Sequence, residues 1–201
     1  MLRKSVILLS LALAIPGVSI AQGEKAKSST NGIINVFPDC DHLPTLLVNL
    51  VANCGFETGD FAGWVQSGDT SFTNVSPDAA HSGTFGARFG PVNDLGFIAQ
   101  RISTIPGQLY NLSFWLVSSG RPNRFQVYWG GVLVSDSMHF PDTVAPSAIP
   151  NAPAYDQLSI PGLPGGSGSF TELKFGFFNM PYYFFLDDIV VVPASAAAVS
   201  N

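Results

Sequence analysis

Residues that could carry out catalysis are few in this chain, and none stands in a catalytic arrangement. The three histidines, His42, His81 and His139, are isolated from one another in the sequence. A hydrolase serine sits in a G-x-S-x-G turn beside a base, and the chain lacks this motif. Glycoside hydrolysis needs two opposed carboxyl groups, whereas neighbours such as Asp187 and Asp188 point to opposite faces of a regular strand. The sequence therefore predicts that the protein is not an enzyme.

Aromatic and amide side chains share faces of two predicted strands. Trp115 alternates onto the same face as Asn111, and Tyr128 shares its face with Gln126. Taken as one mixed face of aromatics and amides, they suit a groove that holds a sugar chain, which needs a rigid ring beside a few placed polar groups. These four residues are candidate ligand contacts, and an ordinary structural role is the competing interpretation of both rings.

Two further groups of residues each have two possible roles. Arg121 and Arg124 precede the strand that holds Tyr128, where a guanidinium group is able to hydrogen-bond sugar hydroxyls or an acidic sugar. The competing interpretation is a pair of solvated loop arginines. Residues 180–185 (MPYYFF) are unusually aromatic. They are predicted to fill space between sheets, and an exposed rim for a ligand or partner is the alternative.

Alternating apolar residues indicate the elements that position these side chains. Period-2 patterns predict strands over residues 109–117, 125–129 and 171–177, and a short strand over 155–160. Frequent Gly and Pro turn signals separate the runs, as in an all-β sandwich or barrel. Two such sheets bury their apolar faces against each other. Trp64 and Trp129 are then expected in the core.

Composition excludes several classes of protein. Charged residues make up 11% of the 201 residues, against about 25% in an ordinary domain. Hydrophobic residues make up 46%, which excludes a disordered chain. The net charge of −5 and the pI of 4.9 argue against binding to nucleic acid or to an anionic membrane.

The first residues are typical of an export signal. Arg3 and Lys4 precede an apolar run, and a small-residue cleavage motif ends at Ala21. We expect cleavage there, a polar tether over residues 22–32 and a secreted or cell-surface location; an uncleaved membrane anchor is the competing interpretation. Loss of residues 1–21 removes two of the nine basic residues, so the mature charge is 7 − 14 = −7. No transmembrane segment is expected in the mature chain.

Cys40 and Cys54 are the two cysteines of the sequence. In an exported protein such a pair indicates a disulfide. The closed loop of about 15 residues would contribute about 3 kcal/mol by the chain-entropy model. A zinc site that also uses His42 is a weaker alternative, because a structural zinc ion takes four ligands.

The order of several motifs points to a family. The blocks are N-C-G-F-E-T-G-D-F-A-G-W (53–64), H-S-G-T-F (81–85), residues 98–116, F-Q-V-Y-W-G-G (125–131), and residues 173–189 with their final F-F-L-D-D-I. Over about residues 48–192, this order resembles the jelly-roll, galactose-binding-like domains of secreted bacterial proteins. It is similar to carbohydrate-binding modules of the family 4/9 type and to PEP-CTERM-like proteins. The resemblance implies an all-β, two-sheet antiparallel jelly-roll sandwich over 33–192 and a tail over 193–201. Cys54 and the absence of a PEP-CTERM ending depart from the pattern.

The resemblance also implies a structural calcium ion, where the first and last strands of such sandwiches meet. Glu57 and Asp187 would supply carboxylates, and Ser82 a backbone carbonyl, which are the ligands a hard cation prefers. A solvated glutamate and a hydrogen-bonded strand pair are the competing interpretation. Broken alternation around Asp187 and Asp188 also predicts a β-bulge there.

Three functions follow in order of preference. The first is a secreted, non-catalytic carbohydrate-binding module that holds polysaccharide or cell-surface glycan. The second is a structural or adhesive protein of the cell envelope or exopolysaccharide matrix, with proteins as partners. The third is a hydrolase with an unrecognised site.

Overall fold

Ten β-strands form almost all of the regular structure in the described part of the chain. The structure is a computed structural model, and it describes residues 40, 43, 48–138 and 154–194, all within the compact unit Val36–Asn201. The predicted signal peptide (1–21) and tether (22–32) therefore lie outside the described residues. The strands are β1 Val65–Gly68, β2 Asn74–Ser76, β3 Gly86–Phe89, β4 Gly96–Ser103, β5 Leu109–Ser118, β6 Arg124–Trp129, β7 Val132–Met138, β8 Asp156–Pro164, β9 Phe170–Phe178 and β10 Phe184–Pro193. One 3-10 turn, η1, spans Pro77–Ala79.

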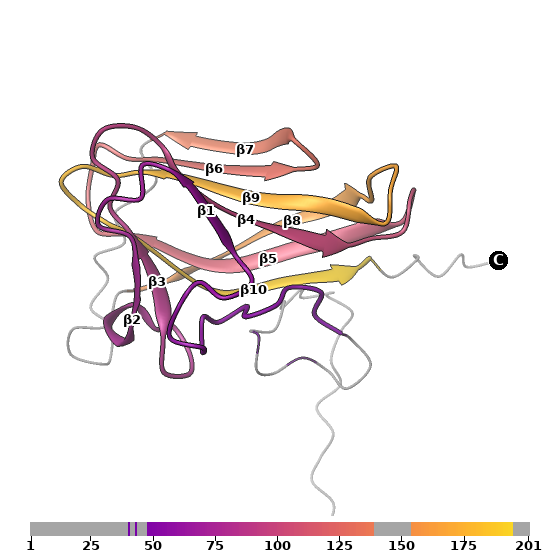
Figure 1. Cartoon of the computed structure of the whole chain (residues 1–201), viewed down its shortest axis with the longest axis horizontal. Helices are drawn as coiled ribbons and strands as arrows, with labels where there is room; N and C mark the ends of the chain where they lie inside the picture. Colours follow the sequence, from indigo (N-terminus) through magenta and orange to yellow (C-terminus); the bar gives the residue numbers. More distant parts are fainter. Residues whose placement is uncertain (1–39, 41–42, 44–47, 139–153, 195–201) are drawn as a thin grey trace, which may run out of the picture. The chain divides into compact units, whose positions relative to one another are not determined.

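The strands form two antiparallel sheets of five strands each. Sheet A has the order β1-β4-β9-β6-β7, and sheet B has the order β2-β3-β10-β5-β8. Figure 1 shows them as stacked layers, with β6 and β7 of sheet A above β5 and β10 of sheet B. This arrangement confirms the predicted all-β, two-sheet antiparallel jelly-roll sandwich.

Strict alternation along the strands explains why the two sheets face each other. In β9, Leu173, Phe175 and Phe177 are fully buried, while Glu172 is exposed and Lys174 half-buried. Phenylalanine dominates the shared core, where the rings of Phe89 and Phe177 stack with centroids 3.9 Å apart. Burial of one such side chain contributes about 1.5–3 kcal/mol.

The predicted core tryptophans and the aromatic run divide between core and surface. Trp64 and Trp129 are 6% and 3% exposed, as expected. Phe184 is buried in the same core, but Met180 and Tyr182 are 50% and 41% exposed. Residues 180–185 were predicted to fill space between the sheets. This prediction is wrong for residues 180–182, which lie in the loop before β10 and are exposed.

A bulge interrupts the last strand, as predicted. Its pairing with β5 shifts register between Asp187 and Val190, and Asp188 has a left-handed φ of 49°. The strand continues to Pro193, and the N–H of Ala194 donates to the carbonyl of Leu109 at 2.8 Å. The ordered sandwich thus reaches slightly beyond residue 192, and residues 195–201 lie outside the described part.

Candidate functional site

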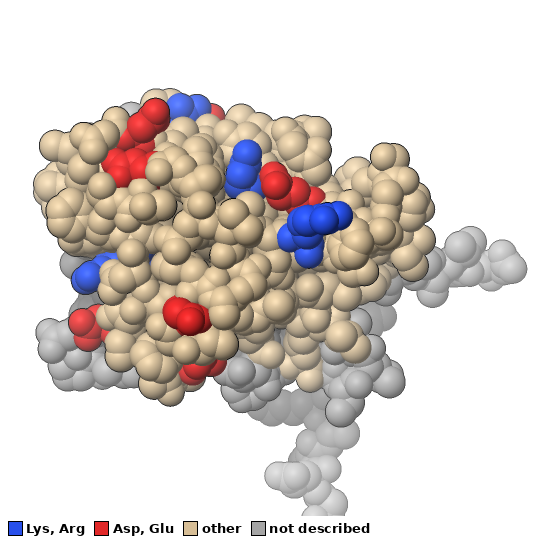
Figure 2. Space-filling model, in the orientation of Figure 1, with Lys and Arg blue, Asp and Glu red and all other residues tan. Residues whose placement is uncertain are grey.

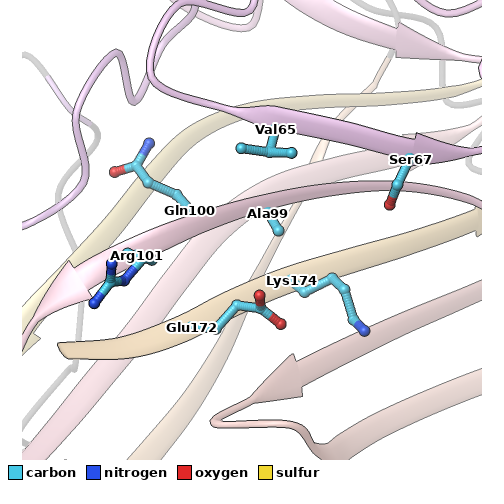
Figure 3. A pocket seen from close by; sticks show the side chains of 7 residues that line it. All are labelled: Val65, Ser67, Ala99, Gln100, Arg101, Glu172 and Lys174. Atoms are coloured by element: carbon cyan, nitrogen blue, oxygen red, sulfur yellow. The ribbon is translucent and has the colours of Figure 1, made fainter. Parts of the chain in front are cut away.

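A groove of about 310 Å³ lies on the outer face of sheet A. Register places its floor: Ala99 of β4 pairs with Lys174 of β9, and Arg101 pairs with Glu172. Because paired residues of antiparallel strands share a face, all four side chains point outward. Figure 3 shows them over neighbouring strands, with Val65 and Ser67 of β1 at one side. The lining residues are Val65, Ser67, Ala99, Gln100, Arg101, Glu172 and Lys174.

Lys174 joins this groove to an aromatic shelf, formed by Phe97 and Tyr128. Its Nζ lies 4.4 Å from the ring centroid of Tyr128 and 5.3 Å from that of Phe97. Tyr128 is the direct partner of Lys174 in the register between β6 and β9. A half-buried ring beside a cation and a groove is a platform with polar groups at its edge.

Three predicted ligand contacts form one network beside the shelf. The hydroxyl of Tyr128 donates to Oε1 of Gln126 at 2.9 Å. Gln126 Nε2 donates to Asp136 of β7 at 3.3 Å, and Arg124 clamps the same carboxylate with bonds of 3.0 and 2.7 Å. The hydrogen bond from Arg124 lowers the pKa of Asp136 below its ordinary value. Arg124 is the first residue of β6 rather than a loop residue, so it is held in place.

The two other predicted contacts lie on the opposite side of the sandwich. Trp115 and Asn111 belong to β5 in sheet B, whereas Tyr128 belongs to sheet A. The single mixed face expected for Trp115 and Tyr128 is therefore wrong, because consecutive strands β5 and β6 cross from one sheet to the other. Trp115 also stacks on His81 with ring centroids 3.9 Å apart. Asn111 accepts a hydrogen bond from the N–H of Gly162 at 3.1 Å.

The β10 bulge turns two buried carboxylates toward the loop that follows η1. Oδ2 of Asp187 accepts hydrogen bonds from the N–H groups of His81 at 2.7 Å and Ser82 at 3.2 Å. Asp188 contacts Nδ1 of His81 at 2.7 Å and accepts from Ser82 Oγ at 2.8 Å. The expectation that these two acids point to opposite faces is wrong, because the bulge breaks the alternation on which it rested. We call this group of residues, with Glu57, the acid corner.

Electrostatics in the acid corner favour the neutral form of Asp187. Burial, and then the charge of Asp188, raises the pKa of Asp187 to about 8. Both residues are at most 1% exposed. Burial is also the first cause that raises the pKa of Tyr155, whose ring lies 5.2 Å from that of His81.

The three residues predicted as calcium ligands lie in this same corner. Glu57 accepts hydrogen bonds from the N–H groups of Thr84 and Phe85 at 3.0 Å, two and three residues after Ser82. A Cβ placed on Gly55 would contact both Oδ1 of Asp187 and the side chain of Glu57, at 3.5 and 3.6 Å. Carboxylates are the donor type that a hard cation prefers, and in this structure those of Glu57 and Asp187 accept backbone N–H bonds. Among the described residues, no group of three or more His, Cys, Asp or Glu side chains has metal-binding geometry.

The predicted disulfide is present and attaches to the acid corner. Cys40 and Cys54 are bonded, with Cα atoms 6.1 Å apart. The carbonyl of Cys54 accepts from the N–H of Ile189 at 3.0 Å, and the N–H of Cys40 donates to Asp188 at 3.4 Å. This finding excludes the zinc alternative for the two thiols.

Sequence reasoning missed the groove itself. Glu172 and Lys174 lie within the strand predicted over residues 171–177, and no role was predicted for them or for Arg101 and Phe97. The available signal was their outward alternation, which matches the observed faces. The pairing of β4 with β9, which brings them together, joins segments about 70 residues apart and has no local sequence mark.

A second hollow of about 240 Å³ lies at the loop end of the sandwich. Phe72, Met180 and Tyr182 border it and are 63%, 50% and 41% exposed. These three side chains form an exposed apolar rim, which is distinct in its residues from the groove on sheet A.

Comparisons with known proteins agree with the architecture. TmCBM61, solved in complex with β-1,4-galactotriose, matches with a TM-score of 0.58 and 18% identity over 73% of this chain and 99% of that chain. The K3 cleaved adhesin domain of Lys-gingipain from Porphyromonas gingivalis matches with a TM-score of 0.52 and 18% identity, over 71% and 98% of the two chains. The enzymatically active domain of tailspike protein 4 from bacteriophage CBA120 has a TM-score of 0.55 at 11% identity, over 73% of this chain but 21% of that one.

These similarities show that the chain has the β-sandwich fold found in carbohydrate-binding modules, as its motif order predicted. No family model and no curated protein matches the sequence. In the part of the chain that the structure describes, no helix has the length and apolar character needed to cross a membrane.

Proposed function

We propose that this protein is an exported, non-catalytic carbohydrate-binding module that holds polysaccharide or cell-surface glycan in the groove on sheet A. The groove carries the proposal, because it combines an open hollow, the shelf of Phe97 and Tyr128, and fixed polar groups. Aromatic rings pack against the apolar faces of sugars, and the polar groups orient the hydroxyls. Arg124 and Tyr128 are the contacts retained from the sequence, and Arg101, Glu172 and Lys174 are added. Gln126 is 3% exposed and supports Tyr128 through its hydrogen bond rather than touching the ligand.

A binding panel of soluble and insoluble polysaccharides tests this function. We expect Tyr128→Ala to lower affinity about tenfold or more, because truncation of a central aromatic contact commonly costs above 1 kcal/mol. Phe72→Ala is the matched control, since it removes an exposed ring outside the groove. Binding of no polysaccharide by the wild type, or equal binding by Tyr128→Ala, would contradict the proposal.

The exposed rim of Phe72, Met180 and Tyr182 favours a second candidate, a structural protein that contacts envelope or matrix proteins. Exposed apolar patches commonly mark protein contacts. In that case Phe72→Ala would weaken assembly with such partners while Tyr128→Ala would not. The same two variants therefore discriminate between the two functions.

Calcium binding in the acid corner is a separate proposal. A bound calcium ion would neutralise the carboxylates of Glu57 and Asp187 and so join the loop after η1 to the last strand. We expect a chelator to lower the melting temperature, and calcium to restore it. Glu57→Gln should lose this response, whereas the exposed Glu172→Gln should keep it. An unchanged melting temperature of the wild type in chelator would rule the site out.

Export is supported by the disulfide, since such bonds persist mainly in oxidising compartments. We expect the secreted protein to begin at Gln22, and an intact mass measurement checks this. A protein retained in the cytoplasm with residues 1–21 attached would contradict it.

A further inference from the structure

The basic residues of the described part are few and concentrated on one face. They are Arg88, Arg101, Arg121, Arg124 and Lys174. Three of these five, Arg101, Arg124 and Lys174, lie on the outer face of sheet A. The acids on that face are Glu172 and Asp136, so its charge is 3 − 2 = +1 in a chain of net charge −5. Figure 2 shows how sparse the charged groups are on a mostly uncharged surface. A positive groove on an acidic protein indicates an anionic ligand.

The three cations differ in whether they form an ion pair with a protein carboxylate. Arg124 is paired with Asp136 at 2.7 Å. Within the described ranges, Arg101 and Lys174 form no ion pair; their charged groups lie over the rings of Phe170 at 4.6 Å and Tyr128 at 4.4 Å. Aromatic faces hold a cation in position without cancelling its charge.

Glu172 completes the arrangement. It lies directly opposite Arg101 and two residues before Lys174, and it lines the same groove. A carboxylate there is able to accept hydrogen bonds from sugar hydroxyls, while the two cations flank it and are available for the ligand's charge. The groove thus presents a hydroxyl acceptor between two positive groups.

We propose that the ligand of this groove is an acidic polysaccharide whose uronate carboxylates bind Lys174 and Arg101. This inference rests on the proposed function and specifies its ligand. Tyr128 supplies the surface for the sugar ring, and the guanidinium group of Arg101 offers the bidentate geometry that suits a carboxylate.

The experiment compares binding of polygalacturonate with binding of the same polymer after methyl esterification, which removes the charge and keeps the chain. Titrations are made in sodium buffer. We expect clear binding of the acid form, weaker binding of the ester, and affinity that falls as salt rises from about 50 to about 500 mM. Lys174→Met and Arg101→Gln should each lower affinity for the acid polymer about tenfold, the size expected for loss of one charged hydrogen bond.

Two control variants separate a local contact from general electrostatics. Arg88→Gln removes the same charge from β3 of sheet B and should leave affinity within about twofold. Lys174→Arg keeps the charge and should retain most of the binding. Equal losses in Lys174→Met and Arg88→Gln would overturn the inference, and so would equal binding of acid and ester polymers.

The outcome also distinguishes failure of the inference from failure of the proposed function. If neutral polysaccharides bind in a Tyr128-dependent way and Lys174→Met changes nothing, the module stands and the acidic ligand is wrong. If no polysaccharide of either kind binds, both proposals are wrong.

Discussion

Individual carboxylates stabilise loops in this protein by accepting hydrogen bonds from backbone N–H groups. Asp69 accepts backbone N–H bonds from Ser71 at 2.9 Å, Val92 at 3.1 Å and Asn93 at 2.8 Å. It thereby joins the loop after β1 to the loop after β3. Hydrogen bonding to Ser71, and then to Asn93, holds the pKa of Asp69 far below its ordinary value.

The sign of this shift predicts an acid-dependent stability. A carboxyl with a lowered pKa in the folded state stabilises the fold above its unfolded pKa, near 4, and loses that effect as pH falls further. We expect the wild-type melting temperature to decline below about pH 4. Asp69→Ala should melt at a lower temperature at pH 7 and show a shallower decline in acid. If the melting temperatures of the two proteins fall by the same amount between pH 6 and pH 3, this role of Asp69 is contradicted.

At the scale of elements, the loop between η1 and β3 depends on Gly83. This residue has a φ of +62°, and a Cβ there would overlap the carboxylate of Glu57. Gly83→Ala must therefore displace Glu57 from Thr84 and Phe85, in addition to the left-handed strain of about 1–2 kcal/mol. We expect a total loss of about 2–4 kcal/mol in the free energy of unfolding, measured by denaturant titration.

A second glycine provides the control for this prediction. Gly107 has a φ of +76°, and nothing lies within 4 Å of a Cβ added to it. Gly107→Ala should show the strain alone. If the two variants lose equal stability, the contact between Glu57 and the loop contributes nothing measurable.

A strand or bulge could be predicted from the sequence where a pattern of neighbouring residues specifies it. The strands around Tyr128 and Phe175 follow from alternation, and the bulge follows from its failure at Asp187 and Asp188. The assignment of Trp115 and Tyr128 to one face did not hold, because the sheet to which a strand belongs depends on partners distant in sequence. The groove could not be predicted for the same reason, because its floor pairs Arg101 of β4 with Glu172 of β9, which are distant in sequence.

At the scale of the whole molecule, low charge and high aromatic content have one physical consequence. The core between the two sheets contains no charged side chain, since a contiguous cluster of aromatic and aliphatic residues fills it. Because surface charges are few, the groove on sheet A has a positive local charge although the net charge of the chain is negative.

The disulfide acts at this same scale, because it closes a loop before the first strand whose two ends both hydrogen-bond to the bulge of the last strand. Cys40 and Cys54 are 14 positions apart, and on the chain-entropy model closure of such a loop stabilises the folded state by about 3 kcal/mol. The double variant Cys40→Ala/Cys54→Ala should lose about that much in denaturant unfolding. Reduced wild type provides the comparison, since it lacks the bond but keeps both side chains, and it should lose a similar amount. If only the double variant is destabilised, the effect arises from packing of Cys54 against the core rather than from the cross-link.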